Sequence, residues 1–388
     1  MPQALEGSQA LAYAVALCRP QVVSAYPITP QTHIVENISK LVADGKFQCE
    51  FVSVESEFSA ASVAFGAVMA GSRAYTASAS QGILLMAEVL YNIAGTRVPL
   101  VMTCANRAVS APLSIWNDQQ DSMAVRDAGW IQLYCADNQE AVDTTIQAYL
   151  ISERCELPVM VCVDGFTLTH TLEPLEIPSQ EQVDGFLPPY HFARTLDPAR
   201  PISSGTLVSP DHFSEARHSH HQALLKAAAE IIAADDAWAA LSGRHYGGLL
   251  QQEGPEDATI GVLTMGSIFG TLAEAREEGN HAVRLIRLRA FRPFPVDALQ
   301  AAAAGLKKLV VLERALSPGG GGILGSEVRA ALSELEQPPA IYSYAVGLGG
   351  RDVPLSLLGA VLERIEERPG ERFAIFDVEV EKLPHEDR

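Results

Sequence analysis

Short apolar runs alternate with helical stretches through the first 170 residues. The runs are apolar on both faces, as strands in the middle of a parallel sheet are. The stretches between them carry apolar residues at helical spacing or are rich in alanine and other small residues. We expect strands at residues 22–26, 51–55, 74–78, 99–103, 131–135 and 158–163, and helices at residues 32–42, 60–70 and 139–153. This order predicts an α/β fold with a doubly wound, mostly parallel sheet.

A second α/β pattern begins at residue 258 with A-T-I-G-V-L-T-M-G-S and a helix that runs to residue 279. Further strands are expected at residues 283–288, 308–314 and 340–346. The preceding segment, Q-Q-E-G-P-E-D-A (251–258), is the best candidate for a linker. We therefore expect two domains, residues 1–250 and residues 256–388.

Residues 171–217 interrupt the pattern. They are rich in Pro, Ser and Asp and show little periodicity, but aromatic and aliphatic residues are interspersed among them. This composition predicts an ordered excursion of the first domain rather than a low-complexity segment. A helix is expected to follow at residues 222–241.

The charge of the chain excludes some classes of binding partner. The chain has 28 Lys and Arg against 47 Asp and Glu, a formal net charge of −19. Such a field argues against nucleic acid or an anionic membrane as a partner. The longest apolar candidate, residues 82–91, is interrupted by Glu88, so no membrane span is expected. The N-terminus lacks the features of a secretory signal, and we expect a cytoplasmic protein.

The six cysteines are scattered along the chain at positions 18, 49, 104, 135, 155 and 162. Iron–sulfur clusters and structural zinc sites need cysteines at short, paired spacings. No such spacing occurs, which predicts reduced structural thiols, no metal site and no cluster in this chain.

One candidate site is the Y-P-I-T-P-Q-T segment (26–32), at the end of the first long strand. Pro27 and Pro30 fix their own φ angles and favour extended geometry in the residues before them. Thr29 lies between them at the carboxyl end of a strand, where α/β folds place ligands. This stiffness predicts a threonine positioned for binding.

Another candidate is V-E-S-E-F-S-A-A-S-V-A-F-G-A-V-M-A-G (54–71). Small residues on the expected helix indicate either close helix packing or the approach of a flat ligand. Glu57 is the exception, because an acidic side chain buried at a strand–helix junction needs a partner.

Together these motifs resemble a known family. S-E-x₈-G-A-x-M-A-G is similar to the pyrimidine-binding domain of thiamine diphosphate enzymes. With Y-P-I-T-P-Q-T, S-A-S-Q-G (78–82) and N-R-A-V-S-A-P-L-S-I-W-N-D-Q-Q-D-S-M (106–123), the chain resembles the alpha subunits of 2-oxoacid:ferredoxin oxidoreductases, most closely those acting on pyruvate. The likeness continues through V-D-G-F-T-L-T-H (163–170) to V-G-L-G-G-R-D (346–352). It implies a pyrimidine-binding domain followed by a transketolase C-terminal-like domain.

The resemblance also implies roles for residues. Glu57 would hydrogen-bond the aminopyrimidine of the cofactor and favour its imino tautomer. Glu55 is the alternative, because it points to the same side of an extended strand. Arg107 would bind the substrate carboxylate through its planar fork, and Thr29 would supply a hydroxyl beside it.

The remaining cofactor contacts implied by the resemblance are Ile28, Ser80 and Gln81. The S-Q-G turn (80–82) is expected to donate backbone N–H groups near the cofactor. The chain has V-D-G-F twice (163–166 and 183–186) but lacks the G-D-G motif that holds Mg²⁺ and diphosphate. The resemblance therefore implies a beta subunit with the diphosphate and Mg²⁺ site. It also implies gamma and ferredoxin-like delta subunits, with the iron–sulfur clusters on these partner subunits.

Two further segments could suggest ligands. H-S-H-H (218–221) is interpreted as a solvated helix start rather than a metal site. S-P-G-G-G-G-I-L-G (317–325) could cradle a phosphate, for example of coenzyme A at residues 319–322, but it lacks the Lys-Ser/Thr of a P-loop. We favour a loop that contacts another subunit.

The expected reaction is oxidation of pyruvate with coenzyme A to acetyl-CoA and CO₂, with ferredoxin as electron acceptor. A branched-chain, aryl or dicarboxylic 2-oxo acid is an alternative substrate, because Thr29 and Arg107 would recognise features common to all of them. A non-catalytic assembly subunit of such a complex is a competing interpretation. The missing G-D-G motif argues against a self-contained decarboxylase or transketolase.

Overall fold

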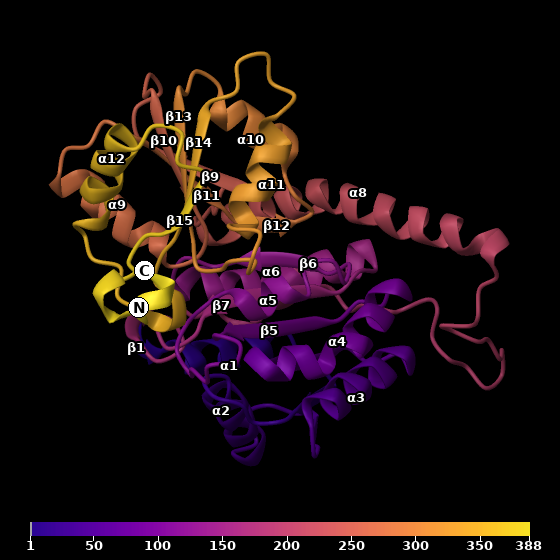
Figure 1. Ribbon diagram of the computed structural model, residues 1–388. Helices are drawn as coiled ribbons and strands as arrows, with labels where there is room; N and C mark the ends of the chain where they lie inside the picture. Colours follow the sequence, from indigo (N-terminus) through magenta and orange to yellow (C-terminus); the bar gives the residue numbers. More distant parts are fainter. Residues whose placement is uncertain (1) are drawn as a thin grey trace.

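The first sheet lies in the lower half of the molecule in Figure 1. The computed structural model describes residues 2–388. Seven strands form this sheet in the order β12-β6-β7-β5-β4-β2-β3. All neighbours are parallel except the β12–β6 pair. The strands are β2 (Val22–Ala25), β3 (Glu50–Ser53), β4 (Ala74–Ser78), β5 (Val101–Asn106), β6 (Ile131–Tyr134), β7 (Val159–Asp164) and β12 (Ala290–Arg292).

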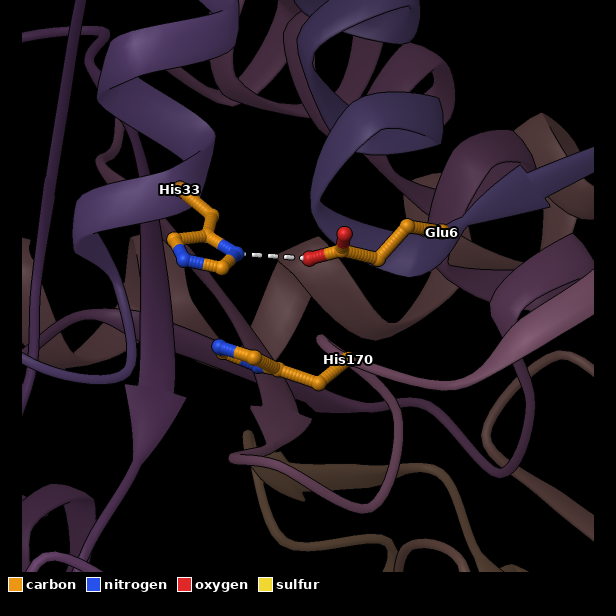
Figure 2. Close-up of side chains that lie close together, drawn as sticks. All are labelled: Glu6, His33 and His170. Atoms are coloured by element: carbon orange, nitrogen blue, oxygen red, sulfur yellow. Dashed lines mark hydrogen bonds and ion pairs between the residues drawn. The ribbon is translucent and has the colours of Figure 1, made fainter.

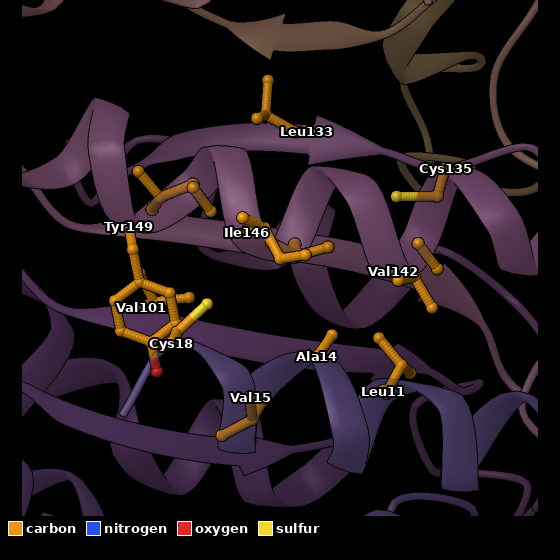
Figure 3. Packing of buried hydrophobic residues seen from close by; sticks show 14 of the residues in the cluster. Leu11, Ala14, Val15, Cys18, Val101, Leu133, Cys135, Val142, Ile146 and Tyr149 are labelled. Carbon is orange, nitrogen blue, oxygen red and sulfur yellow. The ribbon is translucent and has the colours of Figure 1, made fainter. Parts of the chain in front are cut away.

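Helices cover both faces of this sheet, which confirms the doubly wound arrangement. The helices α1 (Gly7–Leu17), α2 (Thr32–Ala43) and α6 (Asn138–Cys155) contribute to one core cluster. Figure 3 shows α1 and α6 side chains packed together there, including Val15 and Ile146. The helices α3 (Glu57–Met69) and α4 (Ser80–Gly95) contribute to the core on the other face. Parallel strands must be covered in this way because both of their faces are apolar.

The second sheet has six strands in the order β15-β14-β13-β10-β11-β9, and only β9 is antiparallel to its neighbour. Its strands are β9 (Leu250–Glu253), β10 (Ile260–Thr264), β11 (Arg284–Leu288), β13 (Lys308–Glu313), β14 (Ala340–Ala345) and β15 (Phe373–Ile375). The helices α9 (Ile268–Glu278) and α12 (Leu357–Glu367) pack on one face. The helices α10 (Val296–Ala303) and α11 (Ile323–Leu332) pack on the other face, in a core that continues into the first sheet's α3 and α4 layer.

The prediction of a linker at residues 251–258 is wrong for the first three of these residues. Gln251, Gln252 and Glu253 belong to β9, which pairs with β11 in the second sheet. In addition, β12 comes from the second half of the sequence but belongs to the first sheet. It pairs with β6, and Ala290 lies opposite Leu133. The two halves therefore share a sheet, and the division at residues 250 and 256 stays a prediction.

The excursion at residues 171–217 contains more regular structure than its composition suggested. A strand, β8 (Leu172–Leu175), pairs antiparallel with β1 (Gln3–Glu6). A short helix, α7 (Gln180–Phe186), begins with a capping box in which Ser179 and Gln182 exchange hydrogen bonds. Residues from 210 onward already belong to the next helix.

That helix, α8 (Pro210–Ser242), begins twelve residues before the predicted start and projects to the right in Figure 1. Pro210 occupies its first turn, a position that proline suits. The H-S-H-H segment therefore lies inside the helix, and His220 is buried, with Nε2 3.2 Å from the Gly129 carbonyl oxygen. The interpretation of this segment as a solvated helix start is wrong for His220.

The remaining described elements are α5 (Gln120–Ala124) and three single-turn 3₁₀ helices, η1 (Leu348–Gly350), η2 (Val380–Lys382) and η3 (His385–Asp387). In the described part of the chain, no helix combines the length and the apolar character that crossing a membrane requires.

Candidate active site

Glu57 lies at the start of α3, close to the carboxyl end of the first sheet's strands. Ser56 caps the helix, because its side chain accepts a hydrogen bond from the Ser59 N–H. This cap makes Glu57 the first helical residue, with only 7% of its surface exposed. Among residues 2–388 the structure gives its carboxylate no hydrogen-bond partner. A buried carboxylate without a partner is costly, which marks this position as a candidate binding group.

The Glu57 side chain lies next to Gly82 in the first turn of α4, close to Ser78 at the end of β4. A Cβ atom added to Gly82 would lie 2.3 Å from the Ser78 hydroxyl oxygen and 2.8 Å from Glu57 Oε1. The Ser78 hydroxyl is also buried without a hydrogen-bond partner in the described structure. Glycine at position 82 therefore leaves room for two polar groups that approach the same space. Ser78 was not singled out from the sequence, although it is the first residue of the quoted S-A-S-Q-G motif.

The alternative carboxylate, Glu55, has different surroundings. It is exposed, and it accepts a hydrogen bond of 2.5 Å from the Ser59 hydroxyl. That bond lowers the pKa of Glu55. An exposed carboxylate that already has a partner fits a dry cofactor contact less well than Glu57 does.

The S-Q-G turn differs from the prediction in its backbone contacts. The Ser80 N–H donates to Asp121 Oδ2 at 2.8 Å, and the Gly82 N–H donates to the Ala79 carbonyl at 2.9 Å. These two N–H groups are therefore engaged inside the protein, and the expectation that they face a ligand is wrong. The Gln81 amide nitrogen Nε2, in contrast, is buried without a partner in the described structure. Gln81 stays a predicted cofactor contact through its side chain.

Ser80 itself holds an unusual conformation. Its φ is +48°, in the left-handed region that non-glycine residues seldom adopt. Its hydroxyl donates to the Ala108 carbonyl at 2.5 Å and lies 2.5 Å from Gln81 Oε1. Such strain persists only where surrounding contacts hold it, and it is common at functional sites.

Asp121 joins this turn to the end of β5. Its fully buried carboxylate accepts N–H groups from Ser80 (2.8 Å) and Arg107 (3.0 Å), and from the Asn106 side chain (2.8 Å) and Ser122 (2.8 Å). Burial raises the pKa of Asp121, and these donors oppose the rise. Four donors on one carboxylate explain how three separate segments keep a common geometry. The sequence showed Asp121 only as part of a motif.

Arg107 and Thr29 lie together, as the resemblance implied. Arg107 Nη1 donates to the Thr29 carbonyl oxygen at 2.8 Å, and Nε donates to the Ser114 carbonyl at 3.0 Å. Burial lowers the pKa of Arg107, and the Asp121 charge opposes this effect. Because a guanidinium has five N–H groups, three remain for a ligand. The Thr29 hydroxyl has no partner among the described residues, and Thr29 is exposed.

Ile28 is half-buried, one residue before Thr29. Its N–H donates to Gln31 Oε1 at 3.2 Å, while Gln31 Nε2 donates to the Ala77 carbonyl at 3.1 Å. The turn after β2 is thereby tied to β4, so the Y-P-I-T-P segment is held by side-chain hydrogen bonds as well as by its prolines.

Comparison with known proteins decides the family. A family model described as "Pyruvate flavodoxin/ferredoxin oxidoreductase, thiamine diP-bdg" matches residues 13–235. The chain belongs to this family. A second model, "Pyruvate:ferredoxin oxidoreductase core domain II", matches residues 258–357. The family predicted from the sequence motifs is confirmed.

Individual relatives agree with this assignment. "Pyruvate synthase subunit PorA" of Methanosarcina barkeri is 45% identical over 94% of this chain and 92% of that protein. The PorA subunit of Methanothermobacter thermautotrophicus is 45% identical over 93% of this chain and 94% of that protein. "Ketoisovalerate oxidoreductase subunit VorA" of Pyrococcus horikoshii is 39% identical over 94% of this chain and 93% of that protein.

A solved structure shares the fold. The 2-oxoglutarate:ferredoxin oxidoreductase of Magnetococcus marinus, with 2-oxoglutarate, coenzyme A and succinyl-CoA bound, superposes with a TM-score of 0.68 at 20% identity. The match covers 94% of this chain and 65% of that longer one. The predicted fold class is confirmed.

The residues around Glu57 fit the cofactor that the oxidoreductase family uses. An aminopyrimidine carries ring-nitrogen acceptors and an amino donor, and it needs polar groups in a dry setting. The Glu57 carboxylate has no hydrogen-bond partner in the described structure, and the Ser78 hydroxyl and the Gln81 amide nitrogen are buried without one. Glu57 and Gln81 would hold the pyrimidine, and Ser78 would lie beside them.

Asp164, in the first V-D-G-F segment, has a structural partner set. Its carboxylate accepts from the Ser267 N–H at 2.8 Å, the Ser267 hydroxyl at 2.6 Å and Arg314 Nη1 at 3.0 Å. Gln119 Nε2 donates to its other oxygen at 3.1 Å. Asp164 ends β7 of the first sheet and Arg314 follows β13 of the second, so this buried ion pair joins the two halves of the chain. With these four donors, the carboxylate is not placed as a metal ligand.

Asp118 makes a second link between the halves. It accepts N–H groups from Gln120 at 2.7 Å and from Gly349 at 3.3 Å. Burial raises the pKa of Asp118 to about 7. The quoted segments 106–123 and 346–352 thus meet through this carboxylate.

The glycine-rich loop at residues 317–325 leads into α11, whose N-terminus is already occupied by an internal anion. Glu313 accepts the N–H groups of Leu324 at 2.7 Å and Gly325 at 3.0 Å. Gly322 leaves room for this carboxylate, since an added Cβ would lie 2.2 Å from Glu313 Oε1. These N–H groups are therefore not free to bind a phosphate.

Proposed function

We propose that this chain is the alpha subunit of a heteromeric pyruvate:ferredoxin oxidoreductase. The reaction would convert pyruvate and coenzyme A to acetyl-CoA and CO₂ and reduce ferredoxin. The observation that carries the proposal is the convergence of buried, unpartnered Glu57 and Ser78 over Gly82, joined through Asp121 to the Arg107–Thr29 pair. The PorA relatives at 45% identity support pyruvate as the substrate.

The proposed roles follow from the contacts. Thiamine diphosphate, when bound, supplies the nucleophilic carbon and the electron sink for decarboxylation. Glu57 holds a proton at its carboxyl group toward the pyrimidine nitrogen, while Gln81 orients the ring. Arg107 uses its remaining N–H groups to bind the substrate carboxylate, and the Thr29 hydroxyl donates a second hydrogen bond to it. The backbone contact between Arg107 and Thr29 orients both groups before the substrate arrives.

The other components would belong to partner subunits. We assign the diphosphate and Mg²⁺ to a beta subunit, and the iron–sulfur clusters to partners that include gamma and ferredoxin-like delta subunits. The helices that begin at the site expose large apolar side chains, among them Phe58 on α3 and Leu84, Leu85 and Tyr91 on α4. Such side chains are suited to a subunit interface that would also exclude water from the cofactor. The cytoplasmic location stays a prediction.

The test is substitution of Glu57 in the assembled complex. Glu57→Gln keeps the size of the side chain but removes its acidity, and we expect decarboxylation to fall by about 100-fold or more. The matched control is Glu55→Gln, which should change the rate by less than about threefold. Release of CO₂ from pyruvate with a low-potential dye as acceptor measures both. If the Glu57 variant keeps most of its activity, the result would favour the alternative that this chain is a non-catalytic assembly subunit.

A panel of 2-oxo acids tests the substrate separately. The VorA relative at 39% identity makes 2-oxoisovalerate the competing substrate. We expect pyruvate to have the highest kcat/KM in the wild-type complex. Negligible turnover of pyruvate, with good turnover of another 2-oxo acid, would overturn the substrate while leaving the mechanism in place.

A further inference from the structure

Glu6, His33 and His170 form a cluster that the proposed reaction does not use. They come from three separate parts of the fold: the end of β1, the first turn of α2 and the segment after β7. Figure 2 shows the three side chains facing one another. One potential ligand atom from each lies within 4.8 Å of the other two. Among residues 2–388, no second group of three His, Cys, Asp or Glu side chains converges in this way.

The contacts inside the cluster leave ligand atoms available. His33 Nδ1 lies 2.8 Å from Glu6 Oε1, and the rings of His33 and His170 are 4.4 Å apart between centroids. His170 Nδ1 lies 2.8 Å from the Thr169 hydroxyl. That bond orients the His170 ring and leaves its Nε2 for a further partner. A hydrogen bond at one ring nitrogen is typical of histidines that bind a metal through the other.

We propose that Glu6, His33 and His170 bind a divalent ion of the zinc class. Two imidazoles and one carboxylate are a ligand set that suits Zn²⁺, with water in the fourth position. Bonds of about 2.0 Å in a tetrahedron require ligand atoms roughly 3.3 Å apart. The His33–Glu6 pair has to open by about 0.5 Å, and His170 has to approach. Each side chain is partly exposed, so small rotations meet this requirement without disturbing the core.

The place of the cluster indicates what such an ion would do. β1 pairs only with β8, in a two-stranded sheet outside the two main sheets, with Glu6 opposite Leu172. An ion held by residues 6, 33 and 170 would cross-link this small sheet to α2 and to the segment that follows β7. Because the ligands are far apart in sequence, the ion would stabilise the folded chain strongly relative to the unfolded one.

The cluster also continues toward the candidate active site through stacked rings. His170 stacks with Phe166 at 4.6 Å between centroids, and Phe166 stacks with Trp116 at the same distance. The Trp116 carbonyl accepts the Ala108 N–H at 3.0 Å, next to Arg107. The ion would therefore stabilise the segment that supports the Arg107 loop, without touching the substrate.

Zinc content provides the test. The assembled complex is treated with a chelator, dialysed against Zn²⁺ and then washed, and zinc per chain is measured by mass spectrometry. We expect one zinc per chain in the wild type and in His212→Asn, an exposed histidine on α8 that serves as the control. His33→Asn, His170→Asn and Glu6→Gln should each weaken zinc binding by about tenfold or more. Iron is counted separately, so the clusters of partner subunits do not interfere.

Thermal unfolding gives an independent measurement. Saturating Zn²⁺ should raise the Tm of the wild type and of His212→Asn by about 5 °C, and should leave His170→Asn unchanged. Without zinc, all variants should have similar Tm values, which shows that they fold. Equal zinc contents in the wild type and the three ligand variants, or a wild type that binds no zinc, would overturn the proposal. Neither result depends on the proposed activity.

Discussion

The Arg107 guanidinium donates a hydrogen bond of 2.8 Å to the carbonyl oxygen of Thr29, across 78 residues of sequence. The contact uses the backbone of Thr29 and leaves its hydroxyl free. The two functions of Thr29 can therefore be separated: its carbonyl orients Arg107, and its hydroxyl is available to the substrate.

Thr29→Val tests the hydroxyl alone. Valine has a similar shape and keeps the carbonyl, so Arg107 should stay in place. We expect kcat/KM for pyruvate to fall by about tenfold, the effect of losing one hydrogen bond to a charged group. Arg107→Lys loses the two hydrogen bonds to the Thr29 and Ser114 carbonyls, and it should lower kcat/KM further. Steady-state rates of the assembled complex measure both, and an unchanged Thr29→Val enzyme would remove the hydroxyl from the mechanism.

Gly82→Ala should disturb the candidate cofactor site without touching the substrate residues. The new methyl group would lie 2.3 Å from Ser78 Oγ and 2.8 Å from Glu57 Oε1, so at least one of them must move. We expect weaker binding of thiamine diphosphate and at least about tenfold lower activity. Gly95→Ala, in the same helix with open space around it, is the matched control and should keep full activity. Similar activities for the two variants would count against the assigned site.

The two V-D-G-F segments permit a matched test of stability. Asp164 forms a buried ion pair with Arg314, whereas Asp184 pairs with Arg19 on the surface. Asp164→Ala leaves a buried cation without its partner and should lower the free energy of unfolding by about 3–5 kcal/mol. Asp184→Ala should change it by about 1 kcal/mol or less. Denaturant unfolding of the complex measures the difference, and equal losses would contradict the structural role of Asp164.

Asp118 predicts how stability varies with pH. Its pKa is raised to about 7 by burial, above its value of about 4 in an unfolded chain. Between these values the folded state binds more protons, so Asp118 stabilises the fold at pH 4 and this contribution is lost as the pH rises through 7. The total is about 4 kcal/mol at most.

Asp118→Asn should therefore gain stability relative to the wild type as the pH rises from 4 to 8. Thermal unfolding at several pH values checks this, with the exposed Asp127→Asn as the control. Parallel pH profiles for wild type and Asp118→Asn would show that folding does not raise the pKa of Asp118.

The pattern of apolar and polar residues was enough to predict most of the long strands and helices, and the motifs were enough to name the residues proposed for the site. Apolar runs predicted the parallel strands of both sheets except the edge strand β15, because burial on both faces leaves a continuous apolar pattern. The family motifs pointed to Glu57, and the structure distinguishes its buried carboxylate from the exposed one of Glu55. Local composition predicted the start of α8 less well. The first turns after Pro210 are exposed, so they carry no apolar face that would indicate a helix.

Which groups share a partner depends on the tertiary fold. The pairing of β12 with β6, the Asp121 carboxylate between Ser80 and Arg107, and the meeting of Glu6, His33 and His170 all join residues that are distant in sequence. Spacing predicts contacts only within a helix or between neighbouring strands. Contacts between separate elements depend on how the layers pack, and the chain does not express that packing in any local pattern.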